Sequence, residues 1–82
     1  MKWYVYIIRA TNEMLYTGIT TDLERRFNEH LDGKKGAKFF RINTPEAIVY
    51  HEEYENRSEA SKREYKIKQL TRKQKLELIS ND

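Results

Sequence analysis

The chain has 82 residues, of which 38% are hydrophobic and 35% charged, with a net charge of +3 and no cysteine. This length provides one core and predicts a single domain over residues 1–82, while the missing cysteines exclude disulfides, a cysteine zinc site and a thiol nucleophile. The longest apolar run, residues 5–8, is too short for a membrane span of about 20 residues, so we expect a cytoplasmic protein with no membrane partner.

The N-terminal segment is predicted to form a β-hairpin. Residues 3–9 are rich in aromatic and β-branched side chains, residues 11–13 have turn chemistry, and residues 14–19 return to a strand-like composition. Apolar and aromatic side chains occupy both faces of the first strand. We therefore expect this strand to lie in the centre of a sheet.

A helix is predicted next, over about residues 22–32. Thr21 and Glu24 have the spacing of a capping box, and Gly33 marks the helix end. Its predicted core-facing stripe consists of Leu23, Phe27 and Leu31. The basic segment 34–41 has room for one or two further helical turns before the sequence Asn43-Thr44-Pro45 interrupts them.

The second half of the chain is predicted to contain one strand and two helices. Residues 47–50 form the strand, which frays toward Tyr54. The pairs Asn56 with Glu59 and Thr71 with Gln74 cap the two helices. The order β-β-α-(α)-β-α-α predicts an α+β fold with mixed α/β layers, in which helices flank a small three-stranded sheet.

Positive charge is concentrated in two segments. Residues 34–41 contain basic side chains and no acid, and residues 56–75 contain eight basic residues and two acidic ones. Such segregation is typical of a surface that binds a polyanion, although solvated lysine-rich helices are the alternative. The candidate nucleic-acid-binding residues are Lys34, Lys35, Lys38, Arg41, Arg63, Lys66 and Lys68.

Four residues near the hairpin and first helix are candidates for chemistry. Tyr6 and Tyr16 can approach each other across the hairpin strands. Arg26 and His30 are i, i+4 neighbours, and Gly18 lets a ligand approach closely. A guanidinium matches phosphate geometry, and an imidazole can accept a proton from water or from a phenol. The structural alternative is two half-buried core tyrosines, a solvated arginine and a boundary histidine.

Glu64 is the most unusual of the candidates. It shares the core-facing side of its predicted helix with Ala60 and Ile67, where a carboxylate needs either an arginine or a metal ion as its partner. One carboxylate, completed by water and phosphate oxygens, is a common way to hold Mg²⁺. Metal-assisted phosphodiester chemistry is therefore possible at these residues, with an internal Glu–Arg ion pair as the alternative.

The order and spacing of these residues resemble the GIY-YIG endonuclease superfamily, in particular its small stand-alone bacterial members of unassigned role. The matching elements are Tyr4-Val5-Tyr6, Tyr16-Thr17-Gly18, residues 19–26 ending at Arg26, His30, and residues 58–64 ending at Glu64. Two motif positions differ, since Tyr4 replaces a glycine and Thr17 replaces an isoleucine. Some members bring a polar residue to the segment where this chain has Phe39 and Phe40.

The resemblance implies a GIY-YIG-like fold and a small nuclease that hydrolyses phosphodiester bonds in DNA, which is favoured over RNA. It implies Tyr6 as general base, Arg26 as phosphate-stabilising residue and Glu64 as the sole protein ligand of Mg²⁺ or Mn²⁺, with Tyr16 and His30 assisting. We expect selection of branched, nicked or flapped DNA, in repair or recombination, with specificity from the basic surface or a protein partner. The alternatives are a non-catalytic nucleic-acid-binding module and a repair-complex adaptor, and the oligomeric state stays open.

Overall fold

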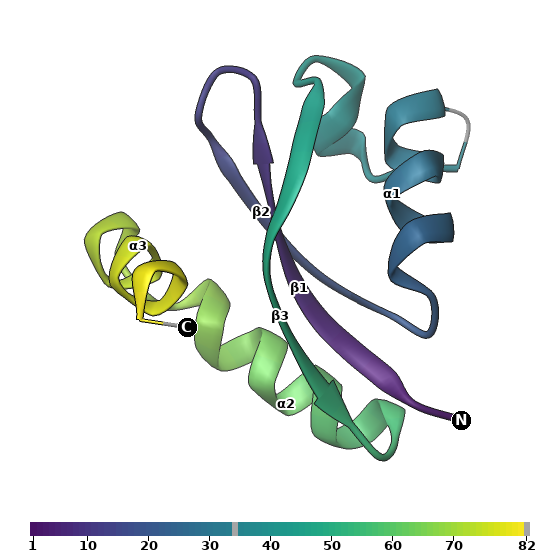
Figure 1. Ribbon diagram of the computed structural model, residues 1–82, viewed down its shortest axis with the longest axis vertical. Helices are drawn as coiled ribbons and strands as arrows, with labels where there is room; N and C mark the ends of the chain where they lie inside the picture. Colours follow the sequence, from purple (N-terminus) through teal and green to yellow (C-terminus); the bar gives the residue numbers. More distant parts are fainter. Residues whose placement is uncertain (34, 82) are drawn as a thin grey trace.

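The computed structural model describes residues 1–33 and 35–81 and contains the elements expected from the sequence in the expected order (Figure 1). They are β1 (Trp3–Ala10), β2 (Leu15–Thr20), α1 (Leu23–Asp32), the 3₁₀ helix η1 (Lys38–Arg41), β3 (Pro45–Tyr54), α2 (Arg57–Lys68) and α3 (Arg72–Ser80). The fold is α+β, as predicted. In the described part of the chain, none of the helices has the length and apolar character that crossing a membrane requires.

The sheet is antiparallel, with the strand order β2-β1-β3. β1 therefore lies in the centre, which confirms the prediction from its two apolar faces. Tyr6 of β1 is opposite Gly18 of β2 on one side and His51 of β3 on the other. β3 extends from Pro45 to Tyr54, which makes it longer than the predicted segment 47–50. Its register with β1 shifts between Ile7 and Ile8 and again between Arg9 and Ala10.

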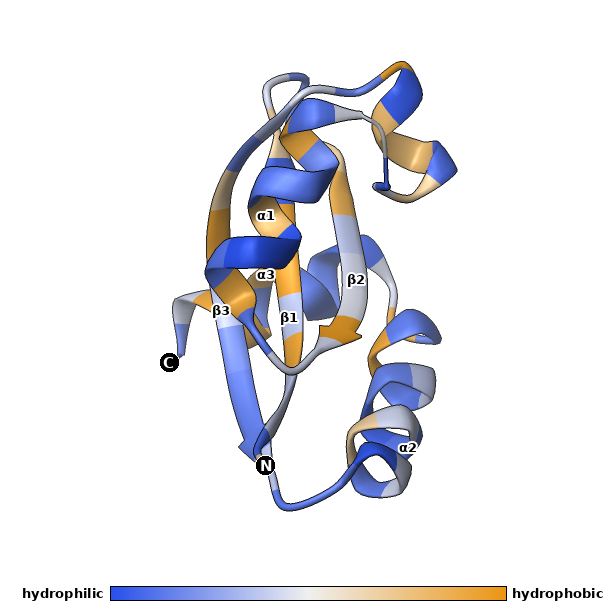
Figure 2. Ribbon diagram, turned by 90° about the vertical axis from the view of Figure 1, so that its right-hand side faces the viewer, coloured by the Kyte–Doolittle hydropathy of each residue, from blue (hydrophilic) through white to orange (hydrophobic). Residues whose placement is uncertain are grey.

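Helices cover both faces of this small sheet, as Figure 1 shows. Val5 and Ile7 of β1 pack with Ala60 and Ile67 of α2, and the side chains of α3 complete this cluster. On the other face, Tyr6 and Ile8 pack with Phe40 of η1 and with Leu23 and Phe27 of α1. In Figure 2 much of β1 and the upper part of β3 are coloured as hydrophobic, whereas the ribbon of α2 is mostly coloured as hydrophilic. The sheet thus separates α1 from α2 and α3.

The helix ends agree with the predicted signals except at α1. Asn56 caps α2 by accepting from Glu59 N–H, and Thr71 and Gln74 form the predicted capping box of α3. At α1 the N-cap is Asp22, whose side chain accepts from Arg25 N–H, so the prediction of Thr21 was wrong by one residue. β2 extends through Thr20, and the helical backbone begins only at Leu23.

The predicted apolar stripe of α1 was wrong at its last position. Leu31 is 55% exposed, whereas the adjacent His30 is 1% exposed. The chain after α1 folds back so that Gly36 and Ala37 contact the imidazole of His30. This return of the chain buries a polar side chain and places it among Tyr6, Tyr16 and Phe40.

Candidate active site

The phenol of Tyr6 reaches across the neighbouring strand at Gly18. Tyr6 is 1% exposed and lies on the α1 face of β1. A Cβ atom at Gly18 would lie 2.5 Å from Tyr6 Oη and 2.7 Å from Cζ, which is closer than side-chain packing permits. The absence of a side chain at residue 18 is therefore what allows the hydroxyl to extend beyond β1 toward α1.

Tyr6 is held by a hydrogen bond to His30 of α1. The two atoms Tyr6 Oη and His30 Nε2 lie 2.8 Å apart. The other ring nitrogen, Nδ1, accepts the backbone N–H of Ala37 at 3.1 Å. In the neutral imidazole the proton therefore lies on Nε2, and His30 donates to the phenol oxygen. This arrangement does not agree with the expectation that His30 accepts a proton from the phenol.

The loop after α1 sets this geometry. Gly36 lies so close to α1 that a Cβ there would be 2.7 Å from His30 Cα and 3.0 Å from Nδ1. Only a residue without a side chain lets the Ala37 N–H come within hydrogen-bonding distance of the ring. The sequence analysis did not single out Gly36 or Ala37, and the only sequence signal for them was a glycine within the basic segment.

The environment favours the neutral forms of both partners. Burial, together with the nearby Arg26 charge, lowers the pKa of His30 to about 4. Burial and the proximity of Tyr16 raise the pKa of Tyr6 to about 12, and Glu64 adds to this effect while Arg26 opposes it. At neutral pH the phenol keeps its proton, and the imidazole is uncharged.

Arg26 is fixed at the edge of the same site by two contacts. Its Nη1 donates to Glu29 Oε1 at 2.9 Å and to the carbonyl oxygen of Lys35 at 2.8 Å. The side chain is 27% exposed, so part of the guanidinium faces solvent. Glu29 lies one helical turn later and was not predicted as a site residue, although its i, i+3 spacing from Arg26 was visible in the sequence.

Tyr16 belongs to an aromatic cluster next to Tyr6 and His30. Its ring centroid lies 5.4 Å from that of His30 and 6.3 Å from that of Tyr6. Phe39 and Phe40 of η1 pack against Tyr16 with centroid distances of 5.4 Å and 5.1 Å. The structure therefore brings both tyrosines together as expected, and the two phenylalanines form an apolar wall beside them.

Glu64 lies on α2 between the buried helix face and solvent. Its side chain is 22% exposed, and its neighbours on that face, Ala60 and Ile67, are fully buried. Its ion-pair partner is Lys68, one turn later, with Nζ 3.1 Å from Oε2. The alternative of an internal Glu–Arg ion pair is therefore not found among the described residues.

The donor set of Glu64 suits one kind of cation. Among residues 1–33 and 35–81, no three His, Asp or Glu side chains gather in a way that could hold a metal ion. Mg²⁺ is often bound through one carboxylate, with water and phosphate oxygens completing its shell. A half-buried single carboxylate fits that requirement, provided that Lys68 leaves it.

The predicted nucleic-acid-binding residues fall into different environments. Lys34 lies outside the described residues, whereas Lys35, Lys38 and Arg41 are exposed on the chain that follows α1. On α2, Lys68 pairs with Glu64 and Lys66 is exposed. The described members of this set thus come from two separate segments, the chain after α1 and helix α2, and their role stays a prediction.

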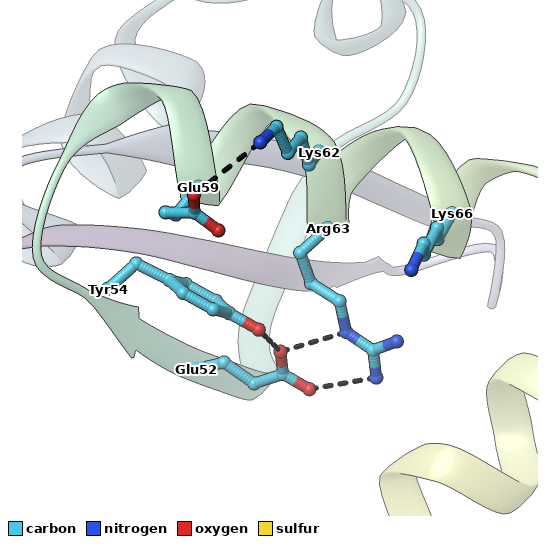
Figure 3. A pocket seen from close by; sticks show the side chains of 6 residues that line it. All are labelled: Glu52, Tyr54, Glu59, Lys62, Arg63 and Lys66. Atoms are coloured by element: carbon cyan, nitrogen blue, oxygen red, sulfur yellow. Dashed lines mark hydrogen bonds and ion pairs between the residues drawn. The ribbon is translucent and has the colours of Figure 1, made fainter.

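Arg63 is engaged in a polar cluster away from Tyr6 (Figure 3). Its Nε and Nη2 donate to the two oxygens of Glu52 at 2.9 Å and 3.0 Å. The hydroxyls of Tyr50 and Tyr54 donate to the same carboxylate. Arg63 and Glu52 line a cavity of about 480 Å³ together with Lys66, but four hydrogen bonds already satisfy Glu52. This cluster therefore joins β3 to α2.

Comparison with known proteins shows which family this chain resembles. A family model described as the GIY-YIG catalytic domain matches residues 2–77. A UPF0213 protein of Clostridium perfringens is 53% identical over 78 residues, which cover 95% of this chain and 83% of the relative. A UPF0213 protein of Desulfotalea psychrophila is 49% identical over 77 residues, which cover 94% of this chain and 70% of the relative.

Two solution NMR structures show the same fold. One is a UPF0213 protein from Bacillus halodurans, with a TM-score of 0.64 and 39% identity, covering 100% of this chain and 86% of that chain. The other is a protein from E. faecalis, with a TM-score of 0.66 and 36% identity, covering 99% of this chain and 85% of that chain.

Proposed function

The chain belongs to the GIY-YIG catalytic domain family, and from this membership we propose that it is a divalent-metal-dependent endonuclease that hydrolyses phosphodiester bonds in DNA. The observation that carries the proposal is the position of the Tyr6 hydroxyl. It is held by His30 and lies within the fields of both Arg26 and Glu64. The proposal thus assigns a base, a cation for phosphate and a carboxylate for a metal ion to this one site.

Tyr6 is the proposed general base. Because His30 Nε2 donates to Oη, the phenol cannot pass its own proton to the imidazole and must first release it to bulk water; the phenolate oxygen can then accept a proton from the attacking water. The same hydrogen bond stabilises the phenolate when that proton leaves. His30 is therefore a positioning residue that holds Tyr6, and Tyr16 packs beside both rings and limits the access of solvent.

Arg26 and Glu64 carry the two charges of the proposed reaction. The part of the Arg26 guanidinium not bound to Glu29 and Lys35 is placed to contact the phosphate oxygens as negative charge develops on them. Glu64 would hold the Mg²⁺ or Mn²⁺ ion. When bound, such an ion supplies positive charge that stabilises the oxygen leaving the phosphorus.

The proposed substrate is DNA with a branch, nick or flap. The residues of the site come from one short strand pair and two helices, and these leave little surface for reading base edges. We propose that the exposed cations Lys35, Lys38 and Arg41 bind the backbone, and that a protein partner adds specificity in repair or recombination. We place the reaction in the cytoplasm, since the sequence contains no cysteine.

One observation favours the alternative of a non-catalytic binding module. Lys68 occupies the carboxylate of Glu64, and Tyr6 keeps its proton to a pKa of about 12. Without a cation to displace Lys68 and lower the pKa of the phenol, the site would bind a backbone without cutting it. The two functions therefore differ in their response to metal.

The test is cleavage of nicked, branched, flapped and linear DNA with Mg²⁺, with Mn²⁺ and with chelator. Glu64→Gln should reduce metal-dependent cleavage about 100-fold or more while DNA binding persists. Glu77→Gln, which removes an exposed carboxylate on α3, is the matched control and should cleave normally. If the wild type binds all substrates in a salt-dependent manner but cuts none with either metal, the binding module replaces the enzyme.

A further inference from the structure

A second cationic cavity adjoins Arg26 and is not used by the proposed chemistry. It has a volume of about 270 Å³ and lies where the end of β2 meets the first turns of α1 and α2. The polar residues lining it are Thr20, Thr21, Arg25, Arg26, Glu29 and Arg57. Arg26 is thus shared between the candidate active site and this cavity.

The cavity carries excess positive charge. Three guanidinium groups face a single carboxylate, that of Glu29. Glu29 pairs closely with Arg26, at 2.9 Å, and more distantly with Arg25, at 3.8 Å. Within the part of the chain that the structure describes, no carboxylate forms an ion pair with Arg57. The guanidinium of Arg57 instead lies over the ring of Trp3, 5.7 Å from its centroid.

The Trp3 contact makes Arg57 a suitable ligand. A guanidinium held over the face of an indole by a cation–π contact keeps its N–H donors available, and the edge of its planar fork can bind an anion. Arg25 also lies partly in the cavity, where its Nη2 is 3.4 Å from Thr20 Oγ1. Planar N–H forks from two different helices, next to threonine hydroxyls, match the oxygens of a phosphate group.

The cavity lies in line with the proposed reaction site. Arg57 and Glu64 are separated by seven positions on α2, so they lie on the same helix face, two turns or about 10 Å apart. Arg26 belongs to both sites and approaches from α1. A nucleic-acid backbone that places one phosphate at Arg26 and Glu64 can therefore continue along α2 toward Arg57.

We propose that this cavity binds a second backbone phosphate of the same DNA strand, next to the one that is cut, with Arg57 and Arg25 as its ligands. The identity of the strand rests on the function proposed above. The cavity sets the position of the cut along the backbone, because a strand held at two adjacent phosphates cannot slide past Tyr6.

The experiment measures binding of a short fluorescent DNA strand in chelator, so that no cleavage is needed for the readout. Arg57→Gln should weaken binding about tenfold and reduce the slope of log Kd against log salt by about 0.7. Arg57→Lys keeps the charge without the planar fork and should be intermediate. Lys73→Gln removes the same charge from the exposed face of α3 and should change the affinity less than about twofold.

Neutral methylphosphonates introduced one position at a time locate the contact. In the wild type, one substitution beside the cut bond should weaken binding as much as Arg57→Gln does, and in Arg57→Gln the same substitution should have no further effect. An additive loss at every position overturns the proposal. Inorganic phosphate that shifts the Arg57 Nε resonance in NMR, when DNA does not, identifies a site for free anions and also overturns it.

Failure of this inference is distinguishable from failure of the nuclease proposal. If the wild type cuts DNA and Arg57→Gln behaves like Lys73→Gln, only the second phosphate site is wrong. If the wild type neither binds nor cuts any DNA, both proposals are wrong.

Discussion

Tyr6 Oη accepts a hydrogen bond from His30 Nε2 across the contact between β1 and α1, at a distance of 2.8 Å. The direction of this bond matters more than its length. A histidine that accepted the phenol proton would leave both lone pairs of the oxygen free and would favour the phenolate, whereas a histidine that donates uses one lone pair, fixes the oxygen and leaves the other lone pair available to water. The direction is set by a backbone N–H, that of Ala37, and so does not depend on another side chain.

Gly18→Ala should impair the site while the protein stays folded. The new Cβ would lie 2.5 Å from Tyr6 Oη, so the phenol must move away from His30. We expect a loss of about 1–3 kcal/mol in the free energy of unfolding and a fall of about 100-fold in cleavage rate. Urea denaturation and a cleavage assay measure the two effects.

Gly33→Ala is the matched control for that substitution. Gly33 has a φ of 81° at the end of α1, and a Cβ there meets nothing within 4 Å. The Gly33→Ala substitution should lower the free energy of unfolding by about 1–2 kcal/mol, through backbone strain alone, and should leave the cleavage rate unchanged. Equal loss of activity in the two variants would show that stability, and not the position of Tyr6, limits the rate.

The buried imidazole predicts a loss of stability in mild acid. The pKa of His30 is about 4 in the folded protein, below its usual value of 6.5, so the unfolded chain binds the proton first. The free energy of unfolding should therefore fall as pH drops from about 6.5 to about 4, by up to about 1.4 kcal/mol per unit. The His30→Phe variant should show a weaker dependence of the free energy of unfolding on pH, as measured by denaturation at each pH. If this pH dependence is the same in the variant and the wild type, His30 is not its cause.

Removal of Lys68 should strengthen metal binding. Its ammonium pairs with Glu64, and a cation at that carboxylate must displace it. Because a partly exposed pair contributes about 0.2–1 kcal/mol, Lys68→Gln should lower the half-saturating Mn²⁺ concentration by up to about fivefold. Lys62→Gln disrupts the comparable pair with Glu59 on the same helix and should have no effect. Titration calorimetry with Mn²⁺ measures the metal affinity of both variants. Weaker Mn²⁺ binding by Lys68→Gln would show that Lys68 does not compete with the metal ion for Glu64.

Thr17→Val should stabilise the protein. Thr17 is 4% exposed, and its hydroxyl has no hydrogen-bond partner within the described residues. Replacing a buried unpaired hydroxyl by a methyl group removes a desolvation cost of about 1 kcal/mol or more. Thr11→Val, at an exposed position, should leave the unfolding midpoint nearly unchanged. A lower midpoint for Thr17→Val would show that the hydroxyl makes a favourable contact after all.

Local patterns predicted the elements of this fold well. The two apolar faces of residues 3–9 identified the central strand, and the spacing of Asn56 with Glu59 and of Thr71 with Gln74 identified two helix starts. These signals act within a few residues, so a single sequence contains them completely.

The parts that could not be predicted depend on contacts between distant segments. His30 is buried because the chain at Gly36 and Ala37 returns to it, and periodicity alone favoured Leu31. The cation–π contact of Arg57 with Trp3 joins two elements that are far apart in the sequence. The family resemblance identified the candidate side chains, but only the fold shows which of them touch.

The residues of the proposed active site are synthesised at different times, because they lie far apart in the sequence. β1, with Tyr6, is synthesised first, but its partner β3 ends at Tyr54 and Glu64 follows on α2. Since a domain's long-range pairings form only once both segments have left the ribosome, the proposed base exists well before the proposed metal ligand. A partly synthesised chain that stops before α2 therefore has the proposed base but lacks the proposed metal ligand, so the proposed nuclease site cannot form until α2 has been made.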